Sequence, residues 1–406
     1  MEKPKIRFKG YQEDWEQRKL GELGSLKNGM NFSKEAMGIG FPFVNLQNIF
    51  GNNVIDVRNL GKAMASDSQL KDYNLLNGDV LFVRSSVKLE GVGEAALVPQ
   101  NLENTTYSGF IIRFRDEYGL DNNFKRFIFG IESVRNQIMA QATNSANKNI
   151  SQTVLENLCL KIPNKSEQEK IGLYFSNLDH LITLHQRKCE ETKILKKYML
   201  QKMFPQNGHS VPEIRFSGFT EDWEQRKFGE IVEKYEDPVE TPTEGYTRLG
   251  IRSHAKGTFH SYVEKGKELE TAKMFRVAAD KFIVNITFGW EHAVAITDEN
   301  DIGKLVSHRF PQYSFNAGMD PKFFRYLILD ENFKHHLELS SPGGAGRNRV
   351  LKLSDMLQYK MNFPSETEQK KIAVYFDDLD NLITLHQRKC KELQNIKKYM
   401  LQNMFV

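Results

Sequence analysis

Residues 167–204 read EQEKIGLYFSNLDHLITLHQRKCEETKILKKYMLQKMF, and residues 368–405 read EQKKIAVYFDDLDNLITLHQRKCKELQNIKKYMLQNMF. The two segments are identical at 26 of 38 positions. Apolar residues recur in each at alternating steps of three and four, the heptad pattern of a helix with one apolar seam. Neither segment contains proline. Each therefore predicts one long helix, roughly 57 Å in length at 1.5 Å per residue.

The two predicted helices need a partner for their single apolar seam, and the other copy is the obvious one. An antiparallel pair with pseudo-twofold symmetry would place the two domains at opposite ends. We expect Ser166 and Thr367 to cap the helices. The expected seam consists of Ile171, Phe175, Leu178, Leu181, Ile182, Leu195 and Met199 in the first helix, and of Ile372, Phe376, Leu379, Leu382, Ile383, Leu393, Ile396 and Met400 in the second.

Two histidines, His185 and His386, occupy the same position in this seam. We interpret them as polar seam residues that set the register of the helices. A metal site or a pH switch is the alternative. Four lysines, Lys196, Lys197, Lys397 and Lys398, are interpreted as a solvated or partner-facing helix surface.

A second repeated motif stands near the start of each half. Residues 7–23 read RFKGYQEDWEQRKLGEL, and residues 215–231 read RFSGFTEDWEQRKFGEI. We interpret Trp15 and Trp223 as packing residues because they are identical in both copies. A repeat distance of about 200 residues indicates duplication of a whole domain and excludes a short solenoid repeat. The predicted organisation is a domain at 1–165, a helix at 166–206, a domain at 207–366 and a helix at 367–406.

The segments between these repeats have diverged almost completely and read as mixed α/β with short strands. Helices are expected around 124–140 and 321–339, each followed by a loop rich in Gly and Asn. The overall prediction is an α+β (mixed α/β) fold. Expected strands lie at 42–49, 78–85 and 108–115 in the first half, and at 246–253, 279–287 and 304–310, in matching order, in the second.

The bulk composition allows two or more hydrophobic cores, because the chain has 406 residues of which 40% are hydrophobic and 27% charged. A formal net charge of +4 is compatible with nucleic-acid binding without arguing for it. Three cysteines without close pairs argue against a disulfide framework and a CxxC zinc site, and favour the cytoplasm. No run of about 18 apolar residues predicts a membrane span.

Sequence motifs of catalysis are missing. The chain has no Walker A, GxGxxG, HExxH or GxSxG motif. The nearest match to the Asn/Asp-Pro-Pro-aromatic motif of DNA amino-methyltransferases, Asp237-Pro238-Val239, lacks the second proline. We therefore predict no catalytic, cofactor-binding or metal-binding residue in this chain.

The order of divergent domain, constant helix, divergent domain and constant helix resembles the DNA-specificity (S) subunit of type I restriction-modification systems. The likeness covers essentially the whole chain. It is carried by W-E-x-x-K-L/F-G-E near each domain start (15–22 and 223–230), by Asp79 and Asp280 before a hydrophobic strand, and by P-x-x-x-E-Q-x-K-I at each helix entry (163–171 and 364–372). A D-x-L-I-x-L-x-x-x-K run from Asp179 and from Asp380 completes it.

The resemblance implies a non-catalytic subunit whose two target recognition domains each read one half of a bipartite site in double-stranded DNA. It implies that the helices set the distance between the half-sites and dock two methyltransferase (modification) subunits, which carry S-adenosylmethionine and methylate adenine. Motor-nuclease (restriction) subunits that use ATP and Mg²⁺ would join for cleavage. No membrane association is implied.

Candidate DNA-reading residues are polar side chains in loops flanked by glycine, because Arg, Lys, Asn, Gln, Ser and Thr supply the hydrogen bonds that read base edges. Ordinary solvated loops are the alternative interpretation. The candidates are Gln47, Asn48, Arg84, Ser85, Ser86, Lys88, Asn147, Lys148 and Asn149 in the first domain, and Arg252, Ser253, His254, Lys256, Asn285, Thr287, Trp290, His292, Arg347, Asn348 and Arg349 in the second.

Three other hypotheses stay open at this point. The chain would be an enzyme if it hid a nuclease or a fused methyltransferase, but the missing motifs argue against this. A coiled-coil adaptor with two protein-binding heads explains the helices equally well, although not the divergence of two otherwise twinned domains. An inactive relative fits the intact tandem arrangement poorly.

Overall fold

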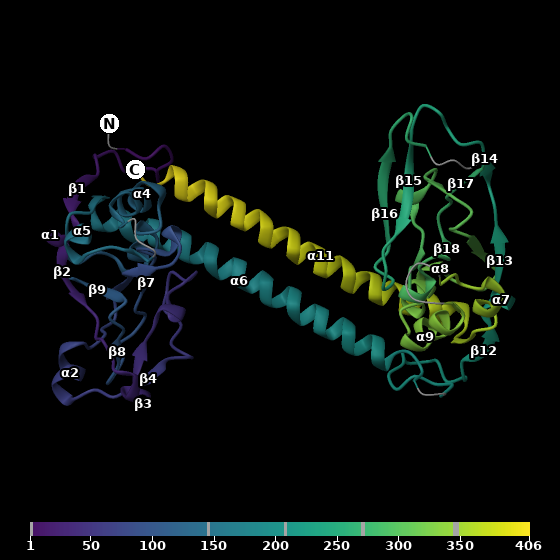
Figure 1. Cartoon of the computed structure of the whole chain (residues 1–406), viewed down its shortest axis with the longest axis horizontal. Coiled ribbons are helices and arrows are strands. Elements are labelled where there is room, and N and C mark those ends of the chain that lie inside the picture. Colours follow the sequence, from purple (N-terminus) through teal and green to yellow (C-terminus); the bar gives the residue numbers. More distant parts are fainter. Residues whose placement is uncertain (1–2, 144–146, 207–208, 269–272, 344–348) are drawn as a thin grey trace. The chain divides into compact units, whose positions relative to one another are not determined.

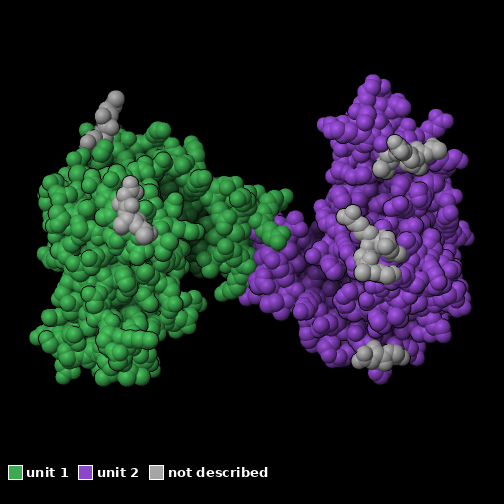
Figure 2. Space-filling view, in the orientation of Figure 1, with its two compact units in different colours: residues 1–187, 387–406 green, residues 188–386 purple. Residues whose placement is uncertain are grey.

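The computed structural model describes residues 3–143, 147–206, 209–268, 273–343 and 349–406. The chain divides into two compact units (Figures 1 and 2). Unit 1 comprises Met1–Arg187 and Gln387–Val406, and unit 2 comprises Lys188–His386. Each unit contains one divergent domain, the first part of the helix that follows it and the last part of the other long helix.

Unit 1 is a mixed α+β unit. Its main sheet has the order β2-β9-β5-β7, with β2 at Gly24–Asn28, β9 at Ile111–Asp116, β5 at Val80–Val83 and β7 at Ala95–Leu97. A second sheet, β4-β3-β8, joins Gly61–Ala63, Met37–Val44 and Thr106–Tyr107. Two-stranded ladders join β1 (Glu16–Lys19) to β11 (Cys159–Ile162) and β6 (Ser85–Ser86) to β10 (Lys148–Asn149). The short helices are α1 (Leu20–Leu23), α2 (Asp67–Asp72), α3 (Asn122–Ile128), α4 (Glu132–Gln141) and α5 (Gln152–Glu156).

Unit 2 repeats this plan. Its main sheet has the order β13-β21-β18-β19, with strands at Val232–Tyr235, Gln312–Phe315, Lys281–Val284 and Val294–Ile296. A five-stranded sheet, β14-β17-β20-β15-β16, joins Pro238–Val239, Met274–Arg276, Leu305–Val306, Tyr246–Ile251 and Thr258–Val263. The ladder of β12 (Glu224–Lys227) with β22 (Lys360–Phe363) matches that of β1 with β11. The short helices are α7 (Phe228–Ile231), α8 (Pro321–Leu327), α9 (Glu331–Leu339) and α10 (Leu353–Met356).

The predicted elements are largely present, with local errors. The helical stretches at 124–140 and 321–339 are each two short helices, α3 with α4 and α8 with α9. The strand expected at 42–49 ends at Val44 and continues as a 3-10 turn at Leu46–Asn48. The expected match of 304–310 to 108–115 is wrong, because the counterpart of β9 in the main sheet is β21, which follows that segment. The loop at Ser307–Phe310 separates β20 from β21, and the predicted strand wrongly ran through it.

Two long helices, α6 (Lys165–Lys202) and α11 (Glu366–Asn403), follow the divergent domains. In unit 1, Lys397 of α11 donates to Asp179 of α6, and Phe405 packs against Phe175. Residue numbers thus rise along α11 as they fall along α6, so the two segments are antiparallel. In unit 2, Lys196 donates to Asp380 and Phe204 packs against Phe376, in the same arrangement.

The predicted seam is correct at its core and wrong at its margins. Ile171, Phe175 and Leu178 are buried, as are their counterparts Ile372, Phe376 and Leu379. Four expected seam residues are instead exposed large hydrophobics: Leu181, Leu195, Leu382 and Ile396. The seam passes through the neighbouring residues Ile182, Lys196, Ile383 and Lys397, which are less exposed.

The lysine and cap predictions need matching corrections. Lys196 and Lys397 are not solvated but lie half-buried in ion pairs with Asp380 and Asp179. A pattern of apolar residues alone could not reveal a seam position that carries a paired lysine. Both predicted N-caps lie inside their helices, and the Asn164 side chain accepts the Glu167 backbone N–H at 3.0 Å instead.

The repeated motifs build the framework of each unit. Trp15 is buried and packs edge-on against Phe405 and Phe124, as Trp223 does against Phe204 and Phe323, which confirms the packing interpretation. In the first turn of α6, buried Glu167 accepts two hydrogen bonds from Arg7, at 2.7 and 2.8 Å. The hydrophobic core of each unit therefore includes the end of the long helix that follows the other divergent domain.

Candidate nucleic-acid interface

In unit 1, the loop after β5 and the segment after α4 meet at a groove. Strand β6 pairs with β10, so that Ser85 lies opposite Asn149 and Ser86 opposite Lys148. A groove of about 510 Å³ lies beside this ladder. The structure therefore brings together two candidate segments that are far apart along the chain. The groove is lined by Leu46, Phe50, Ser85, Ser86, Val87, Lys88, Glu90, Gly91, Glu94, Phe110 and Asn147.

Arg84 stands at the base of this loop. Its backbone N–H donates to Phe110, and its backbone carbonyl accepts the N–H of Ile150. One guanidinium nitrogen lies 3.4 Å from the carbonyl of Gly109. These bonds tie the loop, the start of β9 and the segment after β10 together, so Arg84 serves at least to position the groove.

Gln47 and Asn48 lie on the 3-10 turn after β3 and differ sharply in exposure. Gln47 is exposed, whereas Asn48 is only 2% exposed. The Asn48 amide donates to the carbonyls of Asp56 and Asn59 at 3.0 and 3.1 Å, and its side-chain oxygen accepts the Asn45 N–H. Asn48 therefore closes a loop and is not presented to a base edge. Sequence alone could not separate these neighbours, because both are amides in one turn.

Exposed apolar side chains of the groove escaped the sequence analysis. Val87 is 77% exposed and Phe110 is 57% exposed. A search restricted to hydrogen-bonding residues passes over them. The available signal was a valine within the donor-rich run Arg84–Lys88.

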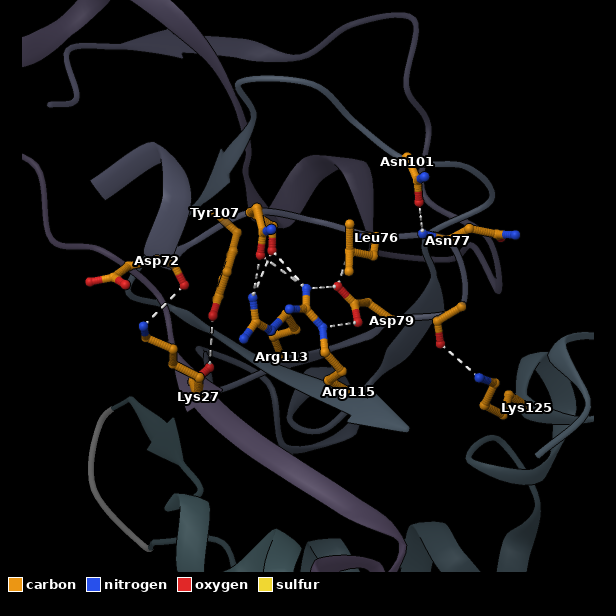
Figure 3. Close-up of polar contacts among 12 residues, drawn as sticks. Lys27, Asp72, Leu76, Asn77, Asp79, Asn101, Tyr107, Arg113, Arg115 and Lys125 are labelled. Carbon is orange, nitrogen blue, oxygen red and sulfur yellow. Dashed lines mark hydrogen bonds and ion pairs between the residues drawn. The ribbon is translucent and has the colours of Figure 1, made fainter. Parts of the chain in front are cut away.

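Arg113 and Arg115 of β9 belong to a polar network of unit 1 that Figure 3 shows in close-up. Arg115 binds both oxygens of the buried Asp79 carboxylate, at 2.9 and 2.7 Å, and Arg113 donates to the backbone of Asn74. The ammonium of buried Lys125 donates to Gly78 at 2.8 Å and pairs with Asp116. Burial lowers the pKa of Lys125, and Asp116 opposes that shift. Asp79 thus has a structural role in holding β5 and β9.

In unit 2, the candidates gather around the tip of the β15–β16 hairpin. The backbone N–H groups of His254 and Ala255 donate to Glu291 and His292, at 2.9 and 2.8 Å. His254 and Ala255 both have positive φ, which the sharp tip requires. This docking brings the segment Arg252–Lys256 against the loop that carries Asn285, Thr287 and Trp290.

A second groove, of about 400 Å³, lies at this hairpin. Ser253 donates to the Glu291 carboxylate, and the Arg252 guanidinium stacks on the Phe259 ring at 5.3 Å. The groove is therefore lined both by candidate DNA-reading residues, Ser253 and Asn285, and by residues that hold the hairpin in place. The lining residues are Arg248, Leu249, Gly250, Ile251, Ser253, Phe259, Asn285, Phe288, Glu291, Ser307 and Phe310.

Two described candidates of the second domain, His292 and Arg349, are held by contacts of their own outside the groove lining. His292 is 4% exposed, its Nε2–H donates to the Ile328 carbonyl at 2.8 Å, and burial lowers its pKa. It is an interior residue rather than a DNA-facing one. Arg349 bonds to the carbonyls of Ser341 and Glu338 and stacks on Trp290 at 5.3 Å. Arg347 and Asn348 lie outside the described residues.

The described residues contain neither a cluster of metal ligands nor a membrane-spanning helix. Across the described residues, no group of three or more His, Cys, Asp or Glu side chains is arranged to hold a metal ion. Neither His185 nor His386 belongs to such a group. Within the same part of the chain, no helix combines the length and apolarity that crossing a membrane requires.

The structure is thus that of a chain with two copies of an α+β domain, each followed by a long helix. The family of the type I restriction modification DNA specificity domain matches it twice, at residues 12–193 and 220–395. The chain belongs to this family. Its members are the non-catalytic specificity subunits of type I restriction-modification systems and carry no cofactor themselves.

Among curated proteins, the chain is similar to the MjaX type I restriction enzyme specificity subunit of Methanocaldococcus jannaschii. The two are 23% identical over 404 residues, covering 96% of this chain and 92% of the relative. It is also 28% identical to the EcoKI specificity subunit of Escherichia coli over 151 residues, covering 37% of this chain and 32% of that protein.

Among solved structures, the S subunit of the type I restriction-modification system from M. genitalium has the same fold. The TM-score is 0.58 at 16% identity, and the alignment covers 100% of this chain and 99% of the other. A chain from a study of complex assembly and conformational transition of the type I system gives a TM-score of 0.50 at 14% identity, with coverage of 96% and 97%. These two likenesses confirm the predicted fold.

Proposed function

We propose that this chain reads a bipartite site in double-stranded DNA, with one half-site assigned to each unit, for a type I restriction-modification complex. The observation that supports this most is the contrast within each unit. Framework contacts such as Arg7 with Glu167 recur as Arg215 with Glu368, whereas the residues lining the two grooves differ. Duplicated scaffolds with different reading surfaces suit two different half-sites on one duplex.

The proposed DNA-facing residues are the hydrogen-bonding side chains around the grooves, since these chemistries discriminate base edges in the major groove. Asn48 and His292 are assigned positioning roles because their side chains are buried. Arg347 and Asn348 remain sequence-based candidates. The remaining set is Gln47, Arg84, Ser85, Ser86, Lys88, Asn147, Lys148 and Asn149 in unit 1, and Arg252, Ser253, His254, Lys256, Asn285, Thr287, Trp290 and Arg349 in unit 2.

The helices are proposed to dock two modification subunits at equivalent surfaces. In unit 1 the exposed Leu181 of α6 and the exposed Ile396 and Tyr399 of α11 supply apolar surface, and in unit 2 Leu382 of α11 and Leu195 and Tyr198 of α6 repeat it. Leu181 and Ile396 each precede a seam residue, so heptad geometry puts them on one side of the pair. Exposed apolar surface of this kind marks a partner site.

The chemistry of the complex is proposed to lie in its other chains. Modification subunits would supply S-adenosylmethionine and methylate adenine, and restriction subunits would use ATP and Mg²⁺. Such a complex acts in the cytoplasm.

The decisive experiment maps adenine methylation across a host genome with and without this gene. We expect one split methylation motif to vanish when the gene is deleted and to return when the gene is restored. A second strain carries the gene with Leu181→Asp and Leu382→Asp together. Methylation should be lost in this strain because the modification subunits no longer dock. An unchanged methylome after deletion would refute the proposed function.

A further inference from the structure

The groove of unit 1 combines exposed apolar side chains with hydrogen-bond donors. Val87 and Phe110 line the groove together with Ser85, Ser86 and Lys88. An exposed valine between Ser86 and Lys88 contributes nothing to the core. Its side chain lies among hydrogen-bond donors and offers an apolar contact within a polar recognition surface.

The backbone around Val87 is fixed on both sides. Ser86 pairs with Lys148 in the β6–β10 ladder, and the backbone N–H of Lys88 donates to the Ser86 hydroxyl at 3.2 Å. The Lys88 carbonyl accepts the N–H of Gly91, also at 3.2 Å. The valine side chain is therefore presented from an anchored turn, so little ordering is needed on binding.

Hydrogen bonds of its own backbone hold Phe110 in place. Its carbonyl accepts the Arg84 N–H at 2.8 Å, and its N–H donates to the Ser108 hydroxyl at 3.3 Å. Strands β5 and β9 pair directly beyond it, at Val83 opposite Ile111. The ring thus stands exposed at the end of the main sheet, on the groove that Val87 also lines.

Two carboxylates on the groove narrow the nature of its occupant. Glu94 accepts the Gly51 N–H at 2.9 Å and so holds the loop that carries Phe50, while Glu90 is exposed. Carboxylates repel phosphate but accept hydrogen bonds from base amino groups. The groove therefore suits base edges better than the DNA backbone.

We infer that Val87 and Phe110 contact the 5-methyl group of a thymine, so that unit 1 reads at least one A·T pair by apolar contact. The thymine methyl is the apolar group that the major groove displays among its polar edges. This inference rests on the proposed function and deepens it by naming the base class for one half-site.

The test deletes the methyl group from the DNA. With the half-sites mapped by methylation, each thymine of both half-sites is replaced singly by deoxyuridine, and binding of the complex with its modification subunits is measured. Wild-type protein should lose about three- to tenfold in affinity at one or more positions of one half-site, from the loss of one buried methyl contact. This measurement needs no variant protein.

Variants then assign the contact. Val87→Thr keeps the branched shape but replaces one methyl group with a hydroxyl, so it should reduce the penalty for deoxyuridine at that position, as should Phe110→Leu. Ile39→Thr is the matched control, because Ile39 is an exposed β-branched residue of the same unit outside the groove, and it should keep the full penalty.

Three results would overturn the inference. The first is that replacing thymine weakens binding at no position of either half-site. The second is that Val87→Thr leaves the loss of affinity for deoxyuridine unchanged. The third is that the main effect of Val87→Thr is weaker assembly with the modification subunits. In each case specific binding of the split site by wild-type protein would leave the proposed function standing. Absence of any split site would refute the proposed function itself.

Discussion

The two units share a framework and differ at their grooves. In unit 1 the groove exposes Val87 and Phe110, beside Ser85 and Ser86 of the β6–β10 ladder. In unit 2 the Arg252 guanidinium covers one face of the Phe259 ring, and Arg248, Asn285 and Glu291 line the walls. One scaffold thus carries a groove with exposed Val87 and Phe110 in one copy, and a groove lined by Arg248, Asn285 and Glu291 among apolar residues in the other. Under the proposed function, the shared scaffold would set where each base is contacted, and the differing loops would set which base is preferred.

The largest expected effect tests whether the frameworks are equivalent. Phe405→Ala and Phe204→Ala each remove a buried ring that packs against a tryptophan. Each should lower the free energy of unfolding by about 3–5 kcal/mol. Urea denaturation followed by tryptophan fluorescence measures this. Tyr399→Ala, at an exposed position, is the control and should change stability little. Clearly unequal losses would mean that the two frameworks are not equivalent.

A smaller effect tests whether the grooves are independent. Lys88→Ala in unit 1 and Asn285→Ala in unit 2 should each cost about 1–3 kcal/mol in specific binding and relax base preference in one half-site only. Competition binding with duplexes altered in either half-site measures this. A lysine that contacts only phosphate would instead weaken binding to all sequences alike, which would remove Lys88 from the set of base-reading residues.

A pH effect should distinguish unit 2 from unit 1. Burial lowers the pKa of His292, so the folded state holds this imidazole neutral. The neutral His292 makes its full contribution to the free energy of unfolding above the unfolded-state pKa of about 6.5. That contribution is lost as the pH falls below this value, by at most about 1.4 kcal/mol per pH unit. Hydrogen exchange of unit 2 amides at pH 7.5 and 5.5 measures the loss. In His292→Gln this dependence should disappear; an unaltered pH profile in the variant would contradict the assignment.

The smallest effect compares adjacent lysines on α6. Lys196→Ala should cost about 1 kcal/mol, because it removes a half-buried ion pair with Asp380. Lys197→Ala, on the exposed side, should stay within about 0.5 kcal/mol of wild type. Thermal unfolding of both variants provides the measurement. Equal shifts would show that the seam ion pair adds no stability.

The sequence predicted the framework well because its signals are periodic and duplicated. Heptad spacing located both long helices, and identity between the copies marked Trp15 and Trp223 as packing residues. It failed where one residue step decides the side of a helix, as at Leu195 and Lys196. It also failed at Asn48 and His292, because a polar side chain reads the same in sequence whether it closes a loop, fills a core or faces a ligand.

The groove residues were only partly predictable for a related reason. Donor-rich loops can be found from residue type, and pairing of Ser85 with Asn149 brought two such loops together. Exposed apolar residues carry no distinguishing mark in sequence, since most valines and phenylalanines are buried. Val87 and Phe110 therefore emerged only from their exposure in the folded chain.

The placement of Met404 and Phe405 in the core of unit 1 has a consequence for biosynthesis. A ribosome makes the first divergent domain early but makes these two residues only after all of unit 2. Until then the aromatic cluster around Trp15 and Phe124 is incomplete. The first divergent domain therefore cannot complete its hydrophobic core until Met404 and Phe405 have been synthesised. A nascent chain truncated within unit 2 leaves the cores of both units incomplete.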